Sequence, residues 1–349
     1  MMTRKFAGLV HIYNKEKEAA TLEARQIRYH AFGEPEQVLQ WEKIALEPPA
    51  AGEMLVRMTA RPINPSDLIP IRGSYVHRIS LPAVPGYEGV GIVKEVGPSV
   101  PKELVGRRVL PLRGEGTWQD YVKTSAALAV PVPDEIDDAT AAQLYINPLT
   151  AWLVCTEVLA LKPGDIVLVN AGGSSIGRVF AQLAKLIGFR LIAVTRNRIH
   201  TEELLRLGAA HVVHTTEAAL HPSVMELTNG RGASAAIDSI GGPEGTELAR
   251  CLQPGGTYLS IGLLSGVPVD WAAIARGTRV RATLFHLRHW LARTTAPAWQ
   301  DTFRRLISAV ADGRLRLPPA AAAYPLAEFR EAVRAVERPG RSGKILLTD

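Results

Sequence analysis

The second half of the chain alternates short hydrophobic runs with longer amphipathic segments. The short runs have the length of strands that are buried on both faces of a parallel sheet. The longer segments carry apolar residues at helical spacing, with polar residues between them. Predicted strands lie at 166–169, 189–194, 235–238 and 256–262, with helices at 176–187 and 201–207. This alternation predicts an α/β fold with a doubly wound parallel sheet.

The residues before this region show short β patterns that are separated by turns and prolines, which is typical of a mostly β domain. Examples lie at 26–30, 53–60, 89–96 and 105–110. A long apolar segment at 141–159 predicts one helix between the two regions, and the tail adds a helix at 327–336 and a strand at 343–347. We expect an N-terminal extension at 1–24, a β domain at 25–147 to which 315–349 returns, and a nucleotide domain at 148–314.

A glycine turn joins the first strand of the alternating region to its helix. Backbone amides in so tight a turn can approach a pyrophosphate, and the helix N-terminus adds roughly half a positive charge. The middle glycine of the usual dinucleotide fingerprint is replaced by serine in this chain. The residues expected to bind the cofactor here are Gly172, Gly173, Ser174, Ser175, Ile176 and Gly177.

Two arginines follow the next strand, at the place that distinguishes one dinucleotide from another. An acidic side chain there would bind the ribose 2′-hydroxyl and repel a 2′-phosphate. This chain has Arg196 and Arg198 instead, about 20 residues past the glycines, and arginine pairs well with phosphate oxygens. The pattern predicts NADPH as the cofactor. The alternative is that both arginines only begin a solvated, basic helix.

Composition narrows the class of protein. The 349 residues carry a net charge of +6, and the arginines are scattered, so nucleic acid is not the expected partner. Only Cys155 and Cys251 are present, which excludes a four-cysteine zinc site and gives no sign of a disulfide framework. No apolar run approaches the roughly 20 residues that span a bilayer, and we expect a cytoplasmic protein that does not bind membranes.

Several short sequence motifs indicate which protein family the chain resembles. They read Ile63-Asn64-Pro65-Ser66-Asp67, Gly73-Ser74-Tyr75, Pro85-Gly86-Tyr87-Glu88-Gly89, Gly116-Thr117-Trp118, Asn147-Pro148-Leu149-Thr150-Ala151 and Leu161-Lys162-Pro163-Gly164-Asp165. With the domain order and the closing Gly-Lys-Ile strand, the chain resembles the medium-chain dehydrogenase/reductase superfamily over residues 25–349. Within it, the chain is similar to the zinc-free branch of quinone oxidoreductases and 2-enoyl thioester reductases. The resemblance implies a GroES-like β domain beside a Rossmann domain.

The same resemblance argues against catalytic zinc, which needs three protein ligands of Cys, His or carboxylate type. Zinc members carry Cys where this chain has Asn64 and His where it has Tyr87. Without a Lewis acid, reduction of an electron-poor double bond by a bound hydride donor is the favoured chemistry. We expect NADPH-dependent reduction of 2-enoyl thioesters. An NADPH:quinone oxidoreductase is the enzymatic alternative, and a non-catalytic nucleotide- or RNA-binding relative is the alternative of another class.

Tyr75 is the expected catalytic residue, because a phenol keeps its proton at pH 7 and can donate it to a developing enolate. In the resembled reductases a tyrosine after this glycine has that role; a tyrosine that only caps the turn is the alternative. Asn64, Asn147 and Thr150 are expected to line the nicotinamide. Asn64 could instead form only an Asx turn, and Thr150 could be only a helix residue.

The resemblance further implies that Ile261, Gly262 and Phe285 are walls around the nicotinamide ring. Trp118 and Trp290 could line an acyl channel, although core packing is the commoner place for such side chains. The family also implies a homodimer in which the edge strands of two nucleotide domains pair.

Overall fold

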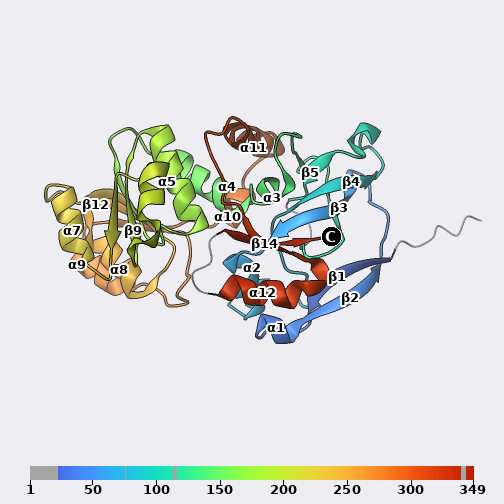
Figure 1. Ribbon diagram of the computed structural model, residues 1–349, viewed down its shortest axis with the longest axis horizontal. Coiled ribbons are helices and arrows are strands. Elements are labelled where there is room, and N and C mark those ends of the chain that lie inside the picture. The colour runs from blue at the N-terminus through green and yellow to red at the C-terminus, as the bar shows by residue number, and fades with distance from the viewer. Residues whose placement is uncertain (1–22, 75, 113–115, 339–342) are drawn as a thin grey trace, which may run out of the picture.

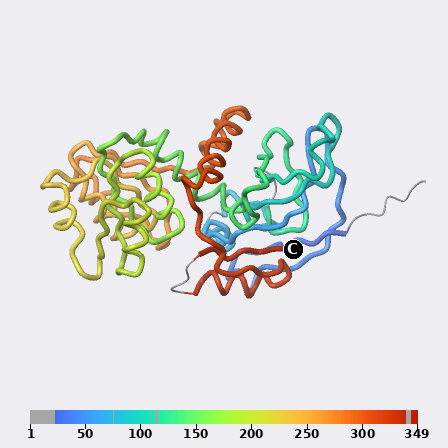
Figure 2. The backbone as a smooth tube through the Cα atoms, turned by 45° about the horizontal axis from the view of Figure 1, so that its top comes forward, coloured from blue at the N-terminus to red at the C-terminus, as the bar shows by residue number. Residues whose placement is uncertain are grey.

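The computed structural model describes residues 23–74, 76–112, 116–338 and 343–349. These residues form two lobes around two large sheets (Figure 1). The lobe with the parallel sheet carries the middle of the sequence. The other lobe carries the N-terminal residues together with the C-terminal strand, as Figure 2 shows. The two-part α/β architecture expected from the sequence is confirmed.

The parallel sheet has the strand order β10-β9-β8-β11-β12-β13, and every neighbouring pair in it is parallel. Numbered from the first strand of the lobe, this order is 3-2-1-4-5-6, which is the dinucleotide-binding order. The strands are β8 (Ile166–Val169), β9 (Arg190–Thr195), β10 (His211–His214), β11 (Ala233–Asp238), β12 (Leu252–Ser260) and β13 (Arg281–Leu284).

Both faces of this sheet are covered, because side chains alternate along each strand. In β8, Val167 and Val169 belong to one hydrophobic core and Leu168 belongs to another on the opposite face. The covering helices are α5 (Ser175–Ile187), α6 (Thr201–Leu207), α7 (Leu220–Leu227), α8 (Gly242–Arg250) and α9 (Trp271–Gly277). Two further helices, α10 (Leu287–Leu291) and α11 (Ala296–Ala311), follow β13, and α11 packs on α4 and the β lobe (Figure 1). The helices predicted at 176–187 and 201–207 are confirmed.

The β lobe contains a seven-stranded sheet with the order β14-β15-β3-β4-β5-β7, in which β6 also pairs with β3. A separate two-stranded sheet pairs β1 (Glu23–Tyr29) with β2 (Leu39–Ala45). The larger sheet contains β3 (Glu53–Pro62), β4 (Val90–Val96), β5 (Arg108–Leu110), β6 (Tyr121–Ser125), β7 (Val130–Pro131), β14 (Ala320–Pro325) and β15 (Lys344–Thr348). Strand β15 pairs antiparallel with β3, so the tail returns to the β lobe as predicted.

Short helices complete this lobe. They are α1 (Pro35–Val38), α2 (Pro65–Ile71) and α12 (Phe329–Glu337), with single 3₁₀ turns at Val76–Arg78, Lys102–Leu104 and Leu326–Glu328. Helix α12 packs Phe329 and Val333 into a core that also contains Trp118 and Ile27. The predicted helix at 327–336 is therefore present and begins two residues later.

The single helix predicted at 141–159 is wrong. The chain forms α3 (Asp138–Ala141), a break, α4 (Ile146–Leu153) and one π-helical turn at Val154–Val158. Pro148 explains the break, because proline has no N–H and is tolerated only in the first turn of a helix. Helix α4 crosses the predicted domain boundary at 147/148, and the domain limits remain a prediction.

One hydrophobic core continues through both lobes. It includes Val90 and Leu110 from the β lobe, and Val167 and Phe180 from the nucleotide lobe. Within the described ranges, no helix is long and apolar enough to cross a membrane. The shared core packs the two lobes against each other, and α4 packs on α5 of the parallel-sheet lobe.

Candidate active site

The predicted glycine turn lies between β8 and α5, at the carboxyl edge of the parallel sheet. Ser174 caps α5, and its Oγ accepts a hydrogen bond from the N–H of Gly177 at 3.2 Å. A Cβ on Gly177 would lie 2.2 Å from the carbonyl oxygen of Gly172, so only glycine allows the helix to start this close to the strand. All six residues predicted from Gly172 to Gly177 therefore belong to one tight turn and the first turn of α5.

Arg178 supports this turn, and the sequence analysis missed it. Its side chain is almost fully buried, donates to the carbonyl oxygen of Gly173, and pairs with Glu203 at 2.9 Å. The ring of His200 packs so closely on Gly173 that a Cβ there would lie 2.1 Å from the ring. Burial and the nearby Arg178 guanidinium lower the pKa of His200, which favours its neutral form. The turn is thus fixed before any ligand binds.

Arg196 and Arg198 follow β9, as predicted, but their side chains differ. Arg198 is exposed and pairs with Glu217, with Nη2 and Oε2 2.6 Å apart. Among the residues that the structure describes, the Arg196 side chain has no hydrogen bond or ion pair, and its carbonyl oxygen accepts from Thr216. Of the two arginines, Arg196 is therefore the one whose guanidinium is not engaged by another described side chain.

Ile261 and Phe285 lie at the same sheet edge. The N–H of Ile261 donates to the carbonyl oxygen of Asp238 at 2.8 Å, and the N–H of Phe285 donates to that of Ser260 at 2.9 Å. Gly262 follows Ile261 and approaches the backbone of Ser239 closely. The predicted walls of a nicotinamide site are thus next to one another, at the ends of two adjacent strands.

Asn64 is buried in a network that the sequence analysis did not foresee. Its Nδ2 donates to Oε1 of Glu88 at 2.7 Å, and its Oδ1 accepts from the ammonium of Lys344. Its backbone N–H donates to Oδ2 of Asp67 at 2.7 Å. Burial raises the pKa of Glu88, and it raises the pKa of Asp67 to about 7.

Asn147 and Thr150 lie in the first two turns of α4, both partly buried. The carboxylate of Glu88 accepts from the backbone N–H of Ile146 at 2.7 Å and from that of Tyr145 at 3.1 Å, where α4 begins. Glu88 therefore connects Asn64 to the helix that carries the other two residues predicted to line the nicotinamide, Asn147 and Thr150.

The two tryptophans pack in hydrophobic clusters. Trp118 is fully buried in the core of the β lobe beside α12, which favours the packing interpretation over a channel wall. Trp290 packs against the ring of Trp299 at 6.1 Å, and its indole N–H donates to Glu157 at 3.0 Å. Its partial burial over the core also favours packing.

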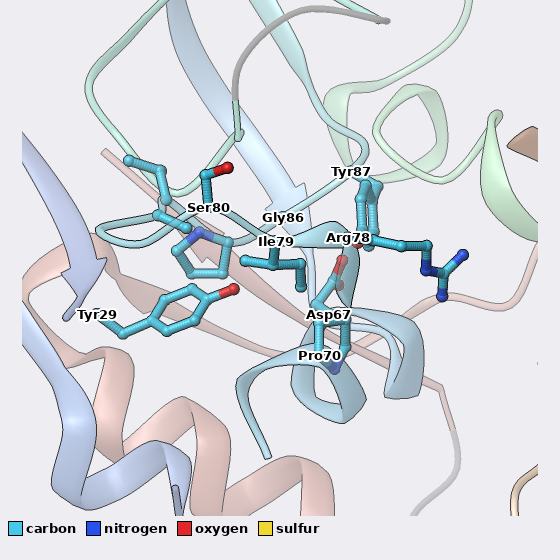
Figure 3. A pocket seen from close by; sticks show the side chains of 11 residues that line it. Tyr29, Asp67, Pro70, Arg78, Ile79, Ser80, Gly86 and Tyr87 are labelled. Carbon is cyan, nitrogen blue, oxygen red and sulfur yellow. The ribbon is translucent and has the colours of Figure 1, made fainter. Parts of the chain in front are cut away.

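Tyr75 lies outside the described residues, so its predicted role stays a prediction. The segments on either side of it, α2 and the 3₁₀ turn at Val76–Arg78, border a cavity of about 230 Å³ (Figure 3). Tyr29, Asp67 and Ser80 contribute polar groups to its lining. Within the described part of the chain, Oδ1 of Asp67 has no hydrogen-bond partner.

Comparisons with known proteins identify the family. Residues 50–134 match the alcohol dehydrogenase GroES-like domain, and residues 207–347 match a family described as zinc-binding dehydrogenase. The mitochondrial enoyl-acyl-carrier-protein reductase of Xenopus tropicalis is 34% identical over 338 residues, which cover 94% of this chain and 96% of that protein. The chain belongs to the medium-chain dehydrogenase/reductase superfamily. The predicted GroES-like and Rossmann domains of this superfamily are confirmed.

Comparison with solved structures supports the same family assignment. A provisionally named NADPH:quinone reductase from Bacillus thuringiensis is 58% identical, with a TM-score of 0.93 over 94% of this chain and 99% of that one. The Escherichia coli quinone oxidoreductase in complex with NADPH is 27% identical, with a TM-score of 0.85 over 93% of this chain and 100% of that one. Relatives of this kind place the chain in the branch of quinone oxidoreductases and enoyl thioester reductases.

The residues at the family's zinc position do not fit a zinc ion. Asn64 offers a carboxamide that already accepts from the ammonium of Lys344, and a buried cation there repels a second one. Cys155 is buried in the π-helical turn after α4, and Cys251 is buried at the C-cap of α8. Among the described residues, no group of three His, Cys, Asp or Glu side chains could hold a metal ion.

Proposed function

We propose that the chain reduces the C=C bond of 2-enoyl thioesters with NADPH. The observation that supports this most directly is the 34% identity to an enoyl-acyl-carrier-protein reductase over almost the whole of both chains. The broader statement, that the chain is an NADPH-dependent oxidoreductase, follows from its family and its solved relatives. That statement disfavours the non-catalytic alternative.

The described residues fit NADPH at its phosphate end. The glycine turn exposes backbone amides at the positive N-terminus of α5, where a pyrophosphate binds favourably. Arg196 follows the neighbouring strand with its guanidinium unengaged by described residues, so it can pair with the 2′-phosphate. Arg198 contributes only when its ion pair with Glu217 opens.

At the nicotinamide end we assign Asn147 and Thr150 as hydrogen-bonding groups and Ile261 and Phe285 as apolar walls, with Gly262 allowing close approach. Asn64 was predicted to join them, but it is buried and its amide is engaged by Glu88 and Lys344, so we assign it to the support of this end rather than to contact with the cofactor. When bound, NADPH supplies the hydride, which goes to the β-carbon of the enoyl group. Negative charge then develops on the thioester oxygen, and the α-carbon takes a proton. The protein must stabilise that enolate and deliver the proton.

We assign the proton delivery to Tyr75. In the sequence, Tyr75 follows Gly73-Ser74 shortly after the end of α2. Asn64 is the N-cap residue of the same helix. A phenol is protonated at neutral pH, so it can donate a hydrogen bond to the enolate oxygen or a proton to the α-carbon.

The second candidate function is NADPH:quinone reduction, which the 58% identity to the Bacillus thuringiensis protein favours. A quinone needs no dedicated proton donor at carbon. The experiment that separates the two compares single-turnover oxidation of NADPH by crotonyl thioesters and by ortho-quinones. Our proposal expects fast oxidation with the thioester; oxidation by quinones alone would establish the second function instead.

We also propose that two copies of the chain pair through β13. All four residues of this edge strand are exposed, and Leu284 is 59% exposed. Leu264 and Val267, 56% and 52% exposed, lie in the segment that connects β12 to α9. A parallel sheet with an open edge and apolar side chains beside it is normally covered, and a two-fold contact covers it symmetrically.

A further inference from the structure

The N-terminus of α4 is capped by a side chain that lies 58 residues earlier in the sequence. The first amides of a helix have no partner within the helix, and a local Ser, Thr, Asp or Asn usually accepts from them. Here the N-cap residue is Tyr145, whose side chain makes no capping hydrogen bond. The carboxylate of Glu88 accepts from the amides of Tyr145 and Ile146 instead, at 3.1 and 2.7 Å.

Glu88 also belongs to a row of hydrogen-bonded side chains that ends at the ammonium of Lys344. Its second oxygen accepts from Nδ2 of Asn64 at 2.7 Å, and Oδ1 of the same amide accepts from Lys344. The exposed fractions of Asn64, Glu88 and Lys344 are 1%, 1% and 4%. Buried charges are costly unless they are paired and fully hydrogen-bonded. Hydrogen bonds link the buried ammonium to the buried carboxylate: Lys344 donates to Asn64, Asn64 donates to Glu88, and Glu88 accepts from the first amides of α4.

This row joins segments that are far apart in the sequence. Asn64 follows β3, Glu88 precedes β4, Lys344 begins β15, and α4 leads from the β lobe into the parallel sheet. The row therefore fixes α4 against the β lobe at the helix end that carries Asn147. Helix α4 also packs on α5, the helix that follows the glycine turn.

We propose that Glu88 is a positioning residue for the reaction: it sets the place of α4, and thereby of Asn147 and Thr150, relative to the nicotinamide. This inference rests on the proposed assignment of Asn147 and Thr150 to the nicotinamide. Hydride transfer depends steeply on alignment, and a displacement of about 1 Å can cost about 100-fold in rate. Glu88 acts without touching the cofactor.

Glu88→Gln tests the proposal with a side chain of nearly the same shape. A glutamine has one acceptor where the carboxylate has two, so it cannot accept from both α4 and Asn64. If the Asn64 amide turns to accept from the glutamine, its NH₂ group then faces the ammonium of Lys344. Each arrangement leaves two donors facing each other, and the end of α4 loosens.

The readout separates positioning from general damage. We expect single-turnover hydride transfer from NADPH to slow by about 10- to 100-fold, with a larger isotope effect when C4 of the nicotinamide is deuterated. Binding of 2′,5′-ADP, which occupies only the phosphate end, should stay within twofold of the parent. Equal losses for 2′,5′-ADP binding and hydride transfer, or no loss in hydride transfer, would overturn the proposal.

A second substitution offers rescue. In Glu88→Gln combined with Lys344→Gln, the turned Asn64 amide accepts from one glutamine and donates to the other, so the row is hydrogen-bonded again without charge. We expect the double variant to recover most of the lost rate, and it also carries the test if Glu88→Gln alone does not fold. A double variant that folds but stays as slow as the single one would contradict the proposal.

Two further variants complete the design. Asp137→Asn removes a carboxylate that caps α3 by accepting from Thr140 at 2.8 Å, and it should leave hydride transfer unchanged. Asn147→Ala with Thr150→Ala tests the underlying assignment. If that pair leaves hydride transfer intact, the nicotinamide assignment fails. If the pair slows hydride transfer while Glu88→Gln does not, only the positioning role fails.

Discussion

Arg198 and Glu217 form a two-point ion pair, with Nε 2.9 Å from Oε1 and Nη2 2.6 Å from Oε2. This pair occupies one of the two guanidiniums that a 2′-phosphate could use. In the proposed NADPH site, Glu217 therefore competes with the phosphate for Arg198. Both side chains are exposed, so the competition is modest and depends on salt.

Glu217→Gln should tighten NADPH binding by about two- to fivefold at low salt, because Arg198 becomes available and a negative charge is removed. NADH binding should not change. Titration calorimetry at two salt concentrations measures both effects. Glu202→Gln is the matched control, since it removes a carboxylate from the surface of the neighbouring helix α6. Equal gains in the two variants would mean that only net charge matters.

Arg196→Asp should weaken NADPH binding by at least about 10-fold and change NADH binding by less than threefold. The variant loses a charge-assisted hydrogen bond, worth roughly 1.5–3 kcal/mol, and places a carboxylate beside the phosphate. Calorimetry with both dinucleotides gives the ratio. A parallel loss for NADH would show that Arg196 does not read the 2′-phosphate.

Tyr75→Phe should lower turnover with enoyl thioesters by about 100-fold, a magnitude typical of lost general acid catalysis, and leave NADPH binding almost intact. Turnover with ortho-quinones should change little, because that reaction needs no proton at carbon. Steady-state rates with both substrates test this. Unchanged turnover with enoyl thioesters would show that Tyr75 does not deliver the proton.

Asp67 predicts a pH dependence of stability. Its pKa is about 7 in the folded chain and near 3.9 in an unfolded one, because burial penalises the charged form. Between these values the folded state holds more protons, so the free energy of unfolding falls as the pH rises. The contribution of Asp67 to the free energy of unfolding is greatest below about pH 4 and is lost as the pH rises to about 7.

Asp67→Asn should remove this slope while keeping an acceptor for the amide of Asn64. The melting temperature of the variant should therefore rise relative to the parent between pH 5 and pH 8. Thermal unfolding across this range measures the difference, with Asp137→Asn as the control. Parallel curves for the parent and Asp67→Asn would contradict the assigned cause.

Leu284→Arg should shift the chain from dimer to monomer, because it places a charge on the exposed edge strand β13. Sedimentation velocity over a range of concentrations measures the change. If the parent chain sediments as a monomer at every concentration, the proposed dimer is wrong.

The parts of the site that depend on neighbours in sequence were predictable. The glycine turn, the start of α5 near Ser175 and the arginines after β9 follow from local pattern, because strand, turn and helix signals lie within about 30 residues. The doubly wound parallel sheet followed from the same alternation, but its strand order is known only from the structure.

The contacts between distant segments were not predictable. Glu88 caps α4 from 58 residues away, and Lys344 approaches Asn64 across 280 residues. No local pattern marks such a pair. The break in the helix predicted at 141–159 shows the same limit, although Pro148 was a signal that could have placed it.

The most direct test of the proposed function is to follow deuterium from NADPH labelled at C4 of the nicotinamide into crotonyl thioester. We predict a saturated thioester with deuterium at the β-carbon and a solvent proton at the α-carbon, seen by NMR of the product. Consumption of NADPH by quinones with no labelled thioester formed would contradict the account.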